Sequence, residues 1–129
     1  MGVHMEWDEH KQIVTVHVEA RWTWEEYQDV TISAFDQISA LDYPVGLIAD
    51  IMRMGSLPPG NFLRHLQNSA ARTPKNLYAT VLVGAPYLVT TFINVVMKVQ
   101  PNPSALVLFA STVDEAKTLV QQHHPGKPV

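Results

Sequence analysis

The segment Pro44–His65 of this 129-residue chain carries the side chains best suited to chemistry. It reads PVGLIADIMRMGSLPPGNFLRH, in which Asp50 lies near the end of an apolar run. Arg53 and Ser56 follow in a short loop, and a helical pattern begins after the double proline. A polar loop between a buried strand and a helix N-terminus is where α/β proteins usually place function. We therefore expect this segment to form the functional edge of the protein.

Ser56 has two interpretations. A phosphate on its hydroxyl would lie near a helix N-terminus, where the helix dipole favours negative charge, and Arg53 and Arg64 could pair with it. Alternatively, Ser56 is an ordinary loop serine that caps the helix. Asp50 likewise either orients a ligand or caps a backbone N–H. The candidate interaction or ligand surface consists of Asp50, Arg53, Ser56, Asn61, Arg64 and His65, with Ser56 as the candidate phosphorylation switch.

The six histidines are not spaced like metal ligands or catalytic groups. His65 has no histidine partner four residues away, and the adjacent His123 and His124 would point about 100° apart on a helix. His17 is expected to face away from the valine side of its strand. The chain shows no paired catalytic carboxylates, no serine–histidine–acid order and no glycine-rich phosphate loop. We therefore expect no enzymatic activity, no metal and no cofactor.

Composition restricts the partners further. The net charge is −3 and nine basic residues are spread thinly, so no basic stripe is available for nucleic acid. The absence of cysteine rules out disulfides and thiolate sites, and it fits a reducing compartment. The first ten residues lack the basic and apolar regions of a secretory signal. We expect a cytoplasmic protein that does not bind nucleic acid.

Residues 76–97 contain no charge, which makes them a candidate membrane span. Gly84 and Pro86 interrupt this run, so we favour a buried strand over 77–83 and a helix over 87–99, with no membrane span. The helix has two apolar stripes, and one stripe is enough to cover a sheet. The second needs a neighbouring helix or a second subunit. One stripe is Leu88, Phe92, Val95 and Val99; the other, our candidate dimer contact, is Val89, Ile93, Val96 and Met97.

Periodicity and capping signals predict the remaining elements within a single domain, 1–129. Alternating residues indicate a hairpin of strands over 2–7 and 12–19. Capping boxes at Thr23 and Thr112 begin two helices, and Pro59 suits the first turn of a third that ends near Arg72. Trp24 is expected in the core, and Trp22 either in the core or at a rim. Further buried strands are expected over 45–51 and 105–109.

The element order is therefore β-β-α-β-α-β-α-β-α, which predicts a mixed, mostly parallel five-stranded sheet with four helices. Over roughly residues 3–123 this order resembles a STAS-type domain, the fold of bacterial anti-sigma-factor antagonists. In that family a serine or threonine between an aspartate and a glycine opens the helix after the central strand and is phosphorylated. Pro58, Pro59 and Asn61 stand at the corresponding positions here. The resemblance implies a non-enzymatic regulatory or adaptor domain that acts through protein–protein contacts.

A small-molecule binder is the alternative. It would hold an apolar or lipid-like ligand in a cleft at the carboxyl ends of the strands, near Asp50, Met52, Met54, Tyr87 and Phe92. The lipid-binding Sec14-like group has a similar layout of sheet and helices. This chain is much shorter, so we do not expect the deep cavity of that group. An enclosed apolar pocket would favour the binder over the adaptor.

Overall fold

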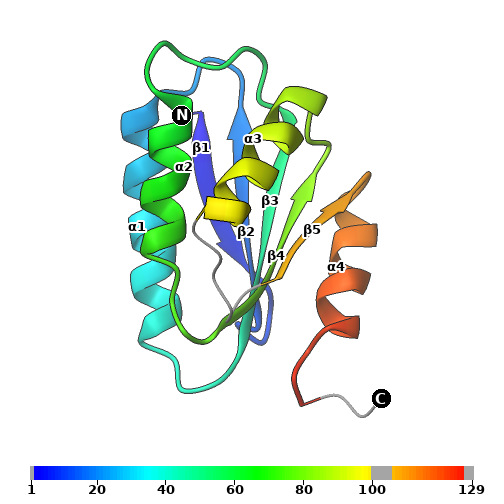
Figure 1. Ribbon diagram of the computed structural model, residues 1–129. Coiled ribbons are helices and arrows are strands. Elements are labelled where there is room, and N and C mark those ends of the chain that lie inside the picture. The colour runs from blue at the N-terminus through cyan, green and yellow to red at the C-terminus, as the bar shows by residue number, and fades with distance from the viewer. Residues whose placement is uncertain (1, 100–105, 127–129) are drawn as a thin grey trace.

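The structure is a computed structural model that describes residues 2–99 and 106–126 (Figure 1). It confirms an α/β fold with a five-stranded mixed sheet and four helices among these residues. The elements in chain order are β1 (Val3–Trp7), β2 (Ile13–Glu19), α1 (Trp24–Ser39), β3 (Val45–Arg53), α2 (Phe62–Ala71), β4 (Leu77–Val83), α3 (Tyr87–Val99), β5 (Leu106–Ala110) and α4 (Val113–Gln122).

The strands lie in the sheet in the order of the sequence, from β1 to β5. β1 is antiparallel to β2, and the other three neighbouring pairs are parallel. Right-handed crossovers that always step in the same direction place their helices on one face of a sheet. Accordingly, α1, α2 and α3 lie over one face, and α4 packs on β3, β4 and β5 from the other (Figure 1).

Alternate residues of each strand face these two layers. On β3, Leu47 and Ile51 belong to the core beneath α1, α2 and α3, whereas Ile48 belongs to the core beneath α4. On β4, the same alternation places Leu82 in the core beneath α1, α2 and α3 and Val81 in the core beneath α4. Because helices cover both faces of these strands, their sequences are nearly continuous apolar runs.

Of the three helix starts expected from a capping residue or a proline, two are confirmed and one is wrong. Thr23 caps α1 in a reciprocal capping box with Glu26, and the Thr112 side chain caps α4. α2 does not begin at Pro59. Its N-cap is Asn61, whose side chain accepts a hydrogen bond from the backbone of Arg64. Asparagine is a strong N-cap, so the helix starts after it and both prolines remain in the loop.

The strand after the first crossover is longer than expected. β3 continues past Ile51 to Arg53, since Arg53 pairs with Glu19 and its carbonyl accepts from the backbone N–H of Ala20 at 2.7 Å. β5 is described from Leu106 onward, and the expected first residue, Ala105, lies outside the described residues.

The uncharged run forms β4 and most of α3, as favoured from the breaks in its sequence. Within residues 2–99 and 106–126, no helix has the length and apolar character needed to cross a bilayer.

Candidate functional site

An apolar pocket of about 210 Å³ lies between the sheet and the layer of α1, α2 and α3. Its floor includes Val16 of β2, Ala49 of β3 and Leu82 of β4. Its walls include Phe35 from α1 and Ile93 from α3. The volume exceeds the ~150 Å³ of an engineered apolar cavity that binds benzene. The pocket is therefore large enough for a small organic molecule.

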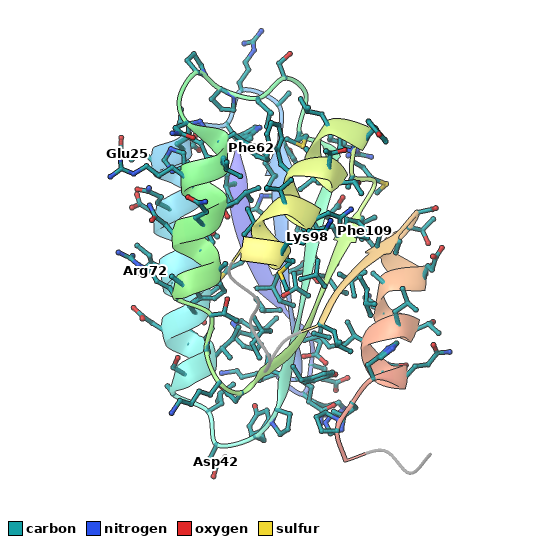
Figure 2. The ribbon with its side chains drawn as sticks, in the orientation of Figure 1. Glu25, Asp42, Phe62, Arg72, Lys98 and Phe109 are labelled. Carbon is teal, nitrogen blue, oxygen red and sulfur yellow. The ribbon has the colours of Figure 1, made fainter. Side chains whose placement is uncertain are left out.

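Helix α2 explains why this space exists. No residue of α2 is fully buried. The sequence predicts that the apolar residues Phe62, Leu63, Leu66 and Ala70 are buried, but all four are only half-buried. Phe62, Leu66 and Ala70 line the pocket. At the start of α2, the Phe62 ring contacts Phe92 of α3 with ring centroids 5.3 Å apart. Figure 2 labels Phe62 on the side of α2 that faces α3. α2 thus forms one wall of the pocket with side chains that are only half-buried.

An aromatic cluster lines the pocket near the start of α1. The Trp22 indole N–H donates to the carbonyl of Met54 at 3.0 Å, and that of Trp24 donates to the carbonyl of Pro58 at 3.3 Å. The Trp24 ring also stacks on His65 at 4.3 Å. Trp22 is 5% exposed and lies in the core rather than at a rim. These contacts hold the loop between β3 and α2 against α1.

One wall of the pocket is polar. Tyr27 of α1 and Ser69 of α2 both line it, and their hydroxyl oxygens are 2.7 Å apart. Thr31 lies one helical turn after Tyr27, and Thr73 follows α2; both also line the pocket. Burial raises the pKa of the Tyr27 hydroxyl, and a hydrogen bond from Thr31 lowers it by less. Tyr27 therefore stays neutral at neutral pH.

A second polar group lies on the opposite face of the sheet, as expected for His17. Its Nδ1 is 2.9 Å from Asp50, and its Nε2 is 2.9 Å from Glu6. The ring stacks on His4 at 4.9 Å. Ionised carboxylates only accept hydrogen bonds, so both ring nitrogens must donate, which favours the imidazolium. Neither nitrogen then has a lone pair left for a metal or a substrate proton.

Charges and burial act in opposite directions on this cluster. Burial lowers the pKa of His17, but the hydrogen bonds and charges of Glu6 and Asp50 outweigh it and raise the pKa overall. The hydrogen bond and charge of His17 in turn lower the pKa of Glu6. Among the described residues, no group of three or more histidine, aspartate or glutamate side chains is arranged to hold a metal ion.

The fold should lose stability as the pH rises through the pKa of His17. The folded-state pKa is raised, so its contribution is complete below the unfolded value of about 6.5 and is lost above the folded value. Urea unfolding at about pH 5.5 and about pH 8 measures this loss. The His17→Gln variant should lose less stability over this interval, whereas His10→Gln, at an exposed position, should behave like the unaltered chain. Equal pH dependence in all three chains would contradict this assignment.

The residues expected to form one interaction surface do not come together. Asp50 faces His17, and its carboxylate also accepts from the backbone N–H of Met52 at 3.3 Å, the capping role considered above. His65 lies on the other side of the sheet, against Trp24. Asn61 serves as the cap of α2. Arg53, Ser56 and Arg64 are exposed, and Ser56 lies in the loop before this cap rather than at the helix N-terminus.

The proposed dimer contacts on α3 are on the wrong side of the helix. Val89, Ile93 and Val96 are buried against the sheet, and Met97 is half-buried beside them. This stripe covers the chain's own sheet and lines the pocket. Apolar residues exposed on α3 instead include Tyr87, Leu88 and Val95.

The pocket also lies away from the cleft expected at the strand ends. Of that set only Met54 lines it, while Met52 and Tyr87 are exposed. A signal for the polar wall was nevertheless present in the sequence. Tyr27 and Thr31, and again Ser69 and Thr73, are hydroxyl side chains four residues apart beside apolar helix faces.

No protein-family model matches this sequence, and no curated protein matches it.

Proposed function

We propose that this domain binds a small apolar ligand in the pocket between the sheet and α1, α2 and α3. The observation that carries the proposal is the volume of about 210 Å³ in a space lined mainly by apolar side chains. Protein interiors are normally close-packed, with few voids larger than a water molecule. A ligand that fills such a space restores dispersion contacts that the lining side chains lack.

Size and charge limit the class of ligand. Sites for drug-sized molecules have volumes of about 300–1,000 Å³, so this pocket suits a smaller compound. The described residues that line it carry no charged side chain. An ionic ligand would leave its charge unpaired at a high cost in free energy. A neutral ring with a short substituent, such as toluene, has a suitable size and polarity.

Filling the pocket from α2 should abolish binding of toluene. Ala70 lines the pocket, whereas its neighbour Ala71 is exposed and does not line it. At about ten times Kd, toluene should stabilise the unaltered chain by about 1.4 kcal/mol and raise Tm by roughly 4–6 °C. Ala70→Leu should remove this shift, and the matched variant Ala71→Leu should retain it. Thermal unfolding followed by circular dichroism, with and without toluene, measures both.

Two results would count against the ligand-binding proposal. One is the absence of any toluene-dependent shift in the unaltered chain. The other is an equal shift in Ala70→Leu and Ala71→Leu, which would place toluene elsewhere on the molecule. Native mass spectrometry of the purified protein provides independent support if a small neutral compound accompanies the chain.

A STAS-like regulatory or adaptor domain, cytoplasmic and homodimeric, is the second candidate. Its support is the order of the elements together with the exposed apolar side chains of α3, where Tyr87 is 87%, Leu88 54% and Val95 43% exposed. Apolar side chains gathered on a surface are typical of contact sites for other proteins. Light scattering should then show a dimer that the Leu88→Glu substitution dissociates, and a monomer at micromolar concentration would exclude the homodimer.

A further inference from the structure

We infer that the pocket selects a neutral amphiphile with a single hydrogen-bond donor, such as a phenol or an alcohol, and orients that donor toward the hydroxyl wall formed by Tyr27, Thr31, Ser69 and Thr73. The inference rests on the proposed function, because it requires that the pocket be occupied. It adds the chemical class and the orientation of the ligand.

The hydrogen atoms of this wall are already engaged within the protein. The Ser69 hydroxyl donates to the carbonyl of His65 at 3.1 Å. Since a hydroxyl has one hydrogen, the 2.7 Å contact between Tyr27 and Ser69 must use the hydrogen of Tyr27. The Thr73 hydroxyl donates to the carbonyl of Ser69 at 3.2 Å. Because the Tyr27 hydrogen is used on Ser69, the hydrogen bond between Thr31 and Tyr27 uses the hydrogen of Thr31. These four side chains therefore have no hydrogen left to offer a ligand.

What remains on the wall is acceptor capacity. A hydroxyl oxygen has two lone pairs, and the Tyr27 oxygen keeps one of them after donating to Ser69 and accepting from Thr31. A ligand O–H or N–H can donate to this oxygen, whereas a carbonyl or ether oxygen would face another lone pair. The wall thus distinguishes a donor from an acceptor at one end of the pocket.

The rest of the pocket sets the remaining features of the ligand. Apart from Thr80 on the floor, the hydroxyl side chains are confined to α1, α2 and the turn after α2, and the sheet and α3 contribute mainly apolar side chains. No charged side chain of the described residues lines the space, so a carboxylate or an ammonium group finds no counter-charge. A short apolar body with one donor at its end matches both parts.

Three probes that share a toluene skeleton test this class: toluene, para-cresol, which adds a donor, and para-tolualdehyde, which adds only an acceptor. Titration calorimetry on the full chain should show para-cresol binding about fivefold to tenfold more tightly than toluene. Para-tolualdehyde should bind no better than toluene. Para-toluate, which is anionic at neutral pH, should show no binding.

Substitutions on the wall should change these preferences in different ways. Tyr27→Phe should reduce the advantage of para-cresol over toluene to about twofold or less. The matched control is Tyr78→Phe, because Tyr78 donates to the carbonyl of Val120 on the other face of the sheet and does not line the pocket. It should keep the full advantage. In Ser69→Ala, the Tyr27 hydrogen loses its acceptor and can turn to the ligand, so para-tolualdehyde should bind more tightly than toluene.

The outcomes separate the two proposals. If toluene and para-cresol bind equally well to the unaltered chain, the pocket is a binding site but the inferred donor selectivity is wrong. The inference also fails if Tyr27→Phe and Tyr78→Phe retain the same preference, or if Ser69→Ala leaves the order of the probes unchanged. If none of the probes binds, the proposed function fails and the inference fails with it.

Discussion

Replacing Asn76 with aspartate should lower the free energy of unfolding by about 3–5 kcal/mol at neutral pH. The Asn76 amide shares its two hydrogens among three backbone carbonyls, at 2.7 Å to Ile38, 3.3 Å to Leu41 and 3.0 Å to Tyr43. These carbonyls belong to the end of α1 and to the connection that leads into β3. A carboxylate cannot donate to any of them, and its charge would repel all three oxygens.

The loss should depend on pH in a defined direction. The surrounding carbonyls raise the folded-state pKa of an aspartate at position 76, so its destabilising effect is smallest below the unfolded value of about 3.9 and grows as the pH rises. Urea unfolding across this range measures the effect. Asn94→Asp, at an exposed position within α3, is the matched control and should cost less than about 0.5 kcal/mol. If Asn76→Asp lowers the free energy of unfolding as little as Asn94→Asp does, the Asn76 amide does not stabilise the fold through these carbonyls.

An alanine at Gly46 should cost about 2–3 kcal/mol, because α4 packs closely on this residue. A Cβ at position 46 would lie 2.4 Å from Cγ1 of Val120, and Val120 is fully buried. Either the strand or α4 would have to move. Chemical denaturation of Gly46→Ala measures the loss.

The double variant Gly46→Ala with Val120→Ala identifies the cause. It removes the atom that the new methyl group meets, so it should be at least as stable as Val120→Ala alone, with a coupling energy of at least about 2–3 kcal/mol. Strictly additive losses would show that the cost of alanine at position 46 arises from its own strand and not from α4.

The secondary structure follows from signals that lie close together in the sequence. Thr23 and Glu26 form a capping box because their side chains and backbones are neighbours on one helical turn. The strand over 77–83 and the helix over 87–99 have the predicted bounds, since Gly84 and Pro86 separate two different periodicities. The predicted start of α2 at Pro59 was wrong, because proline suits a first helical turn but does not fix where that turn begins.

The site could not be predicted in the same way. Periodicity indicates which face of α2 is apolar, but the pocket depends on how far this helix lies from the sheet. The assignment of Val89, Ile93 and Val96 to a dimer contact failed for a related reason, since two apolar stripes on α3 look alike in sequence. The amide of Asn76 donates to carbonyls 33 to 38 residues away in the sequence, and no local sequence pattern predicts such a contact.

The order of the strands also bears on how the chain folds and opens. Each strand pairs with the one before it, so no late strand has to insert between two that are already joined. Contacts of short sequence separation favour rapid folding. β3 has a paired strand on each side and covered faces, whereas β1 and β5 each have one neighbour in the described sheet. Amide hydrogen exchange should therefore be slowest in β3 and become faster toward both edges.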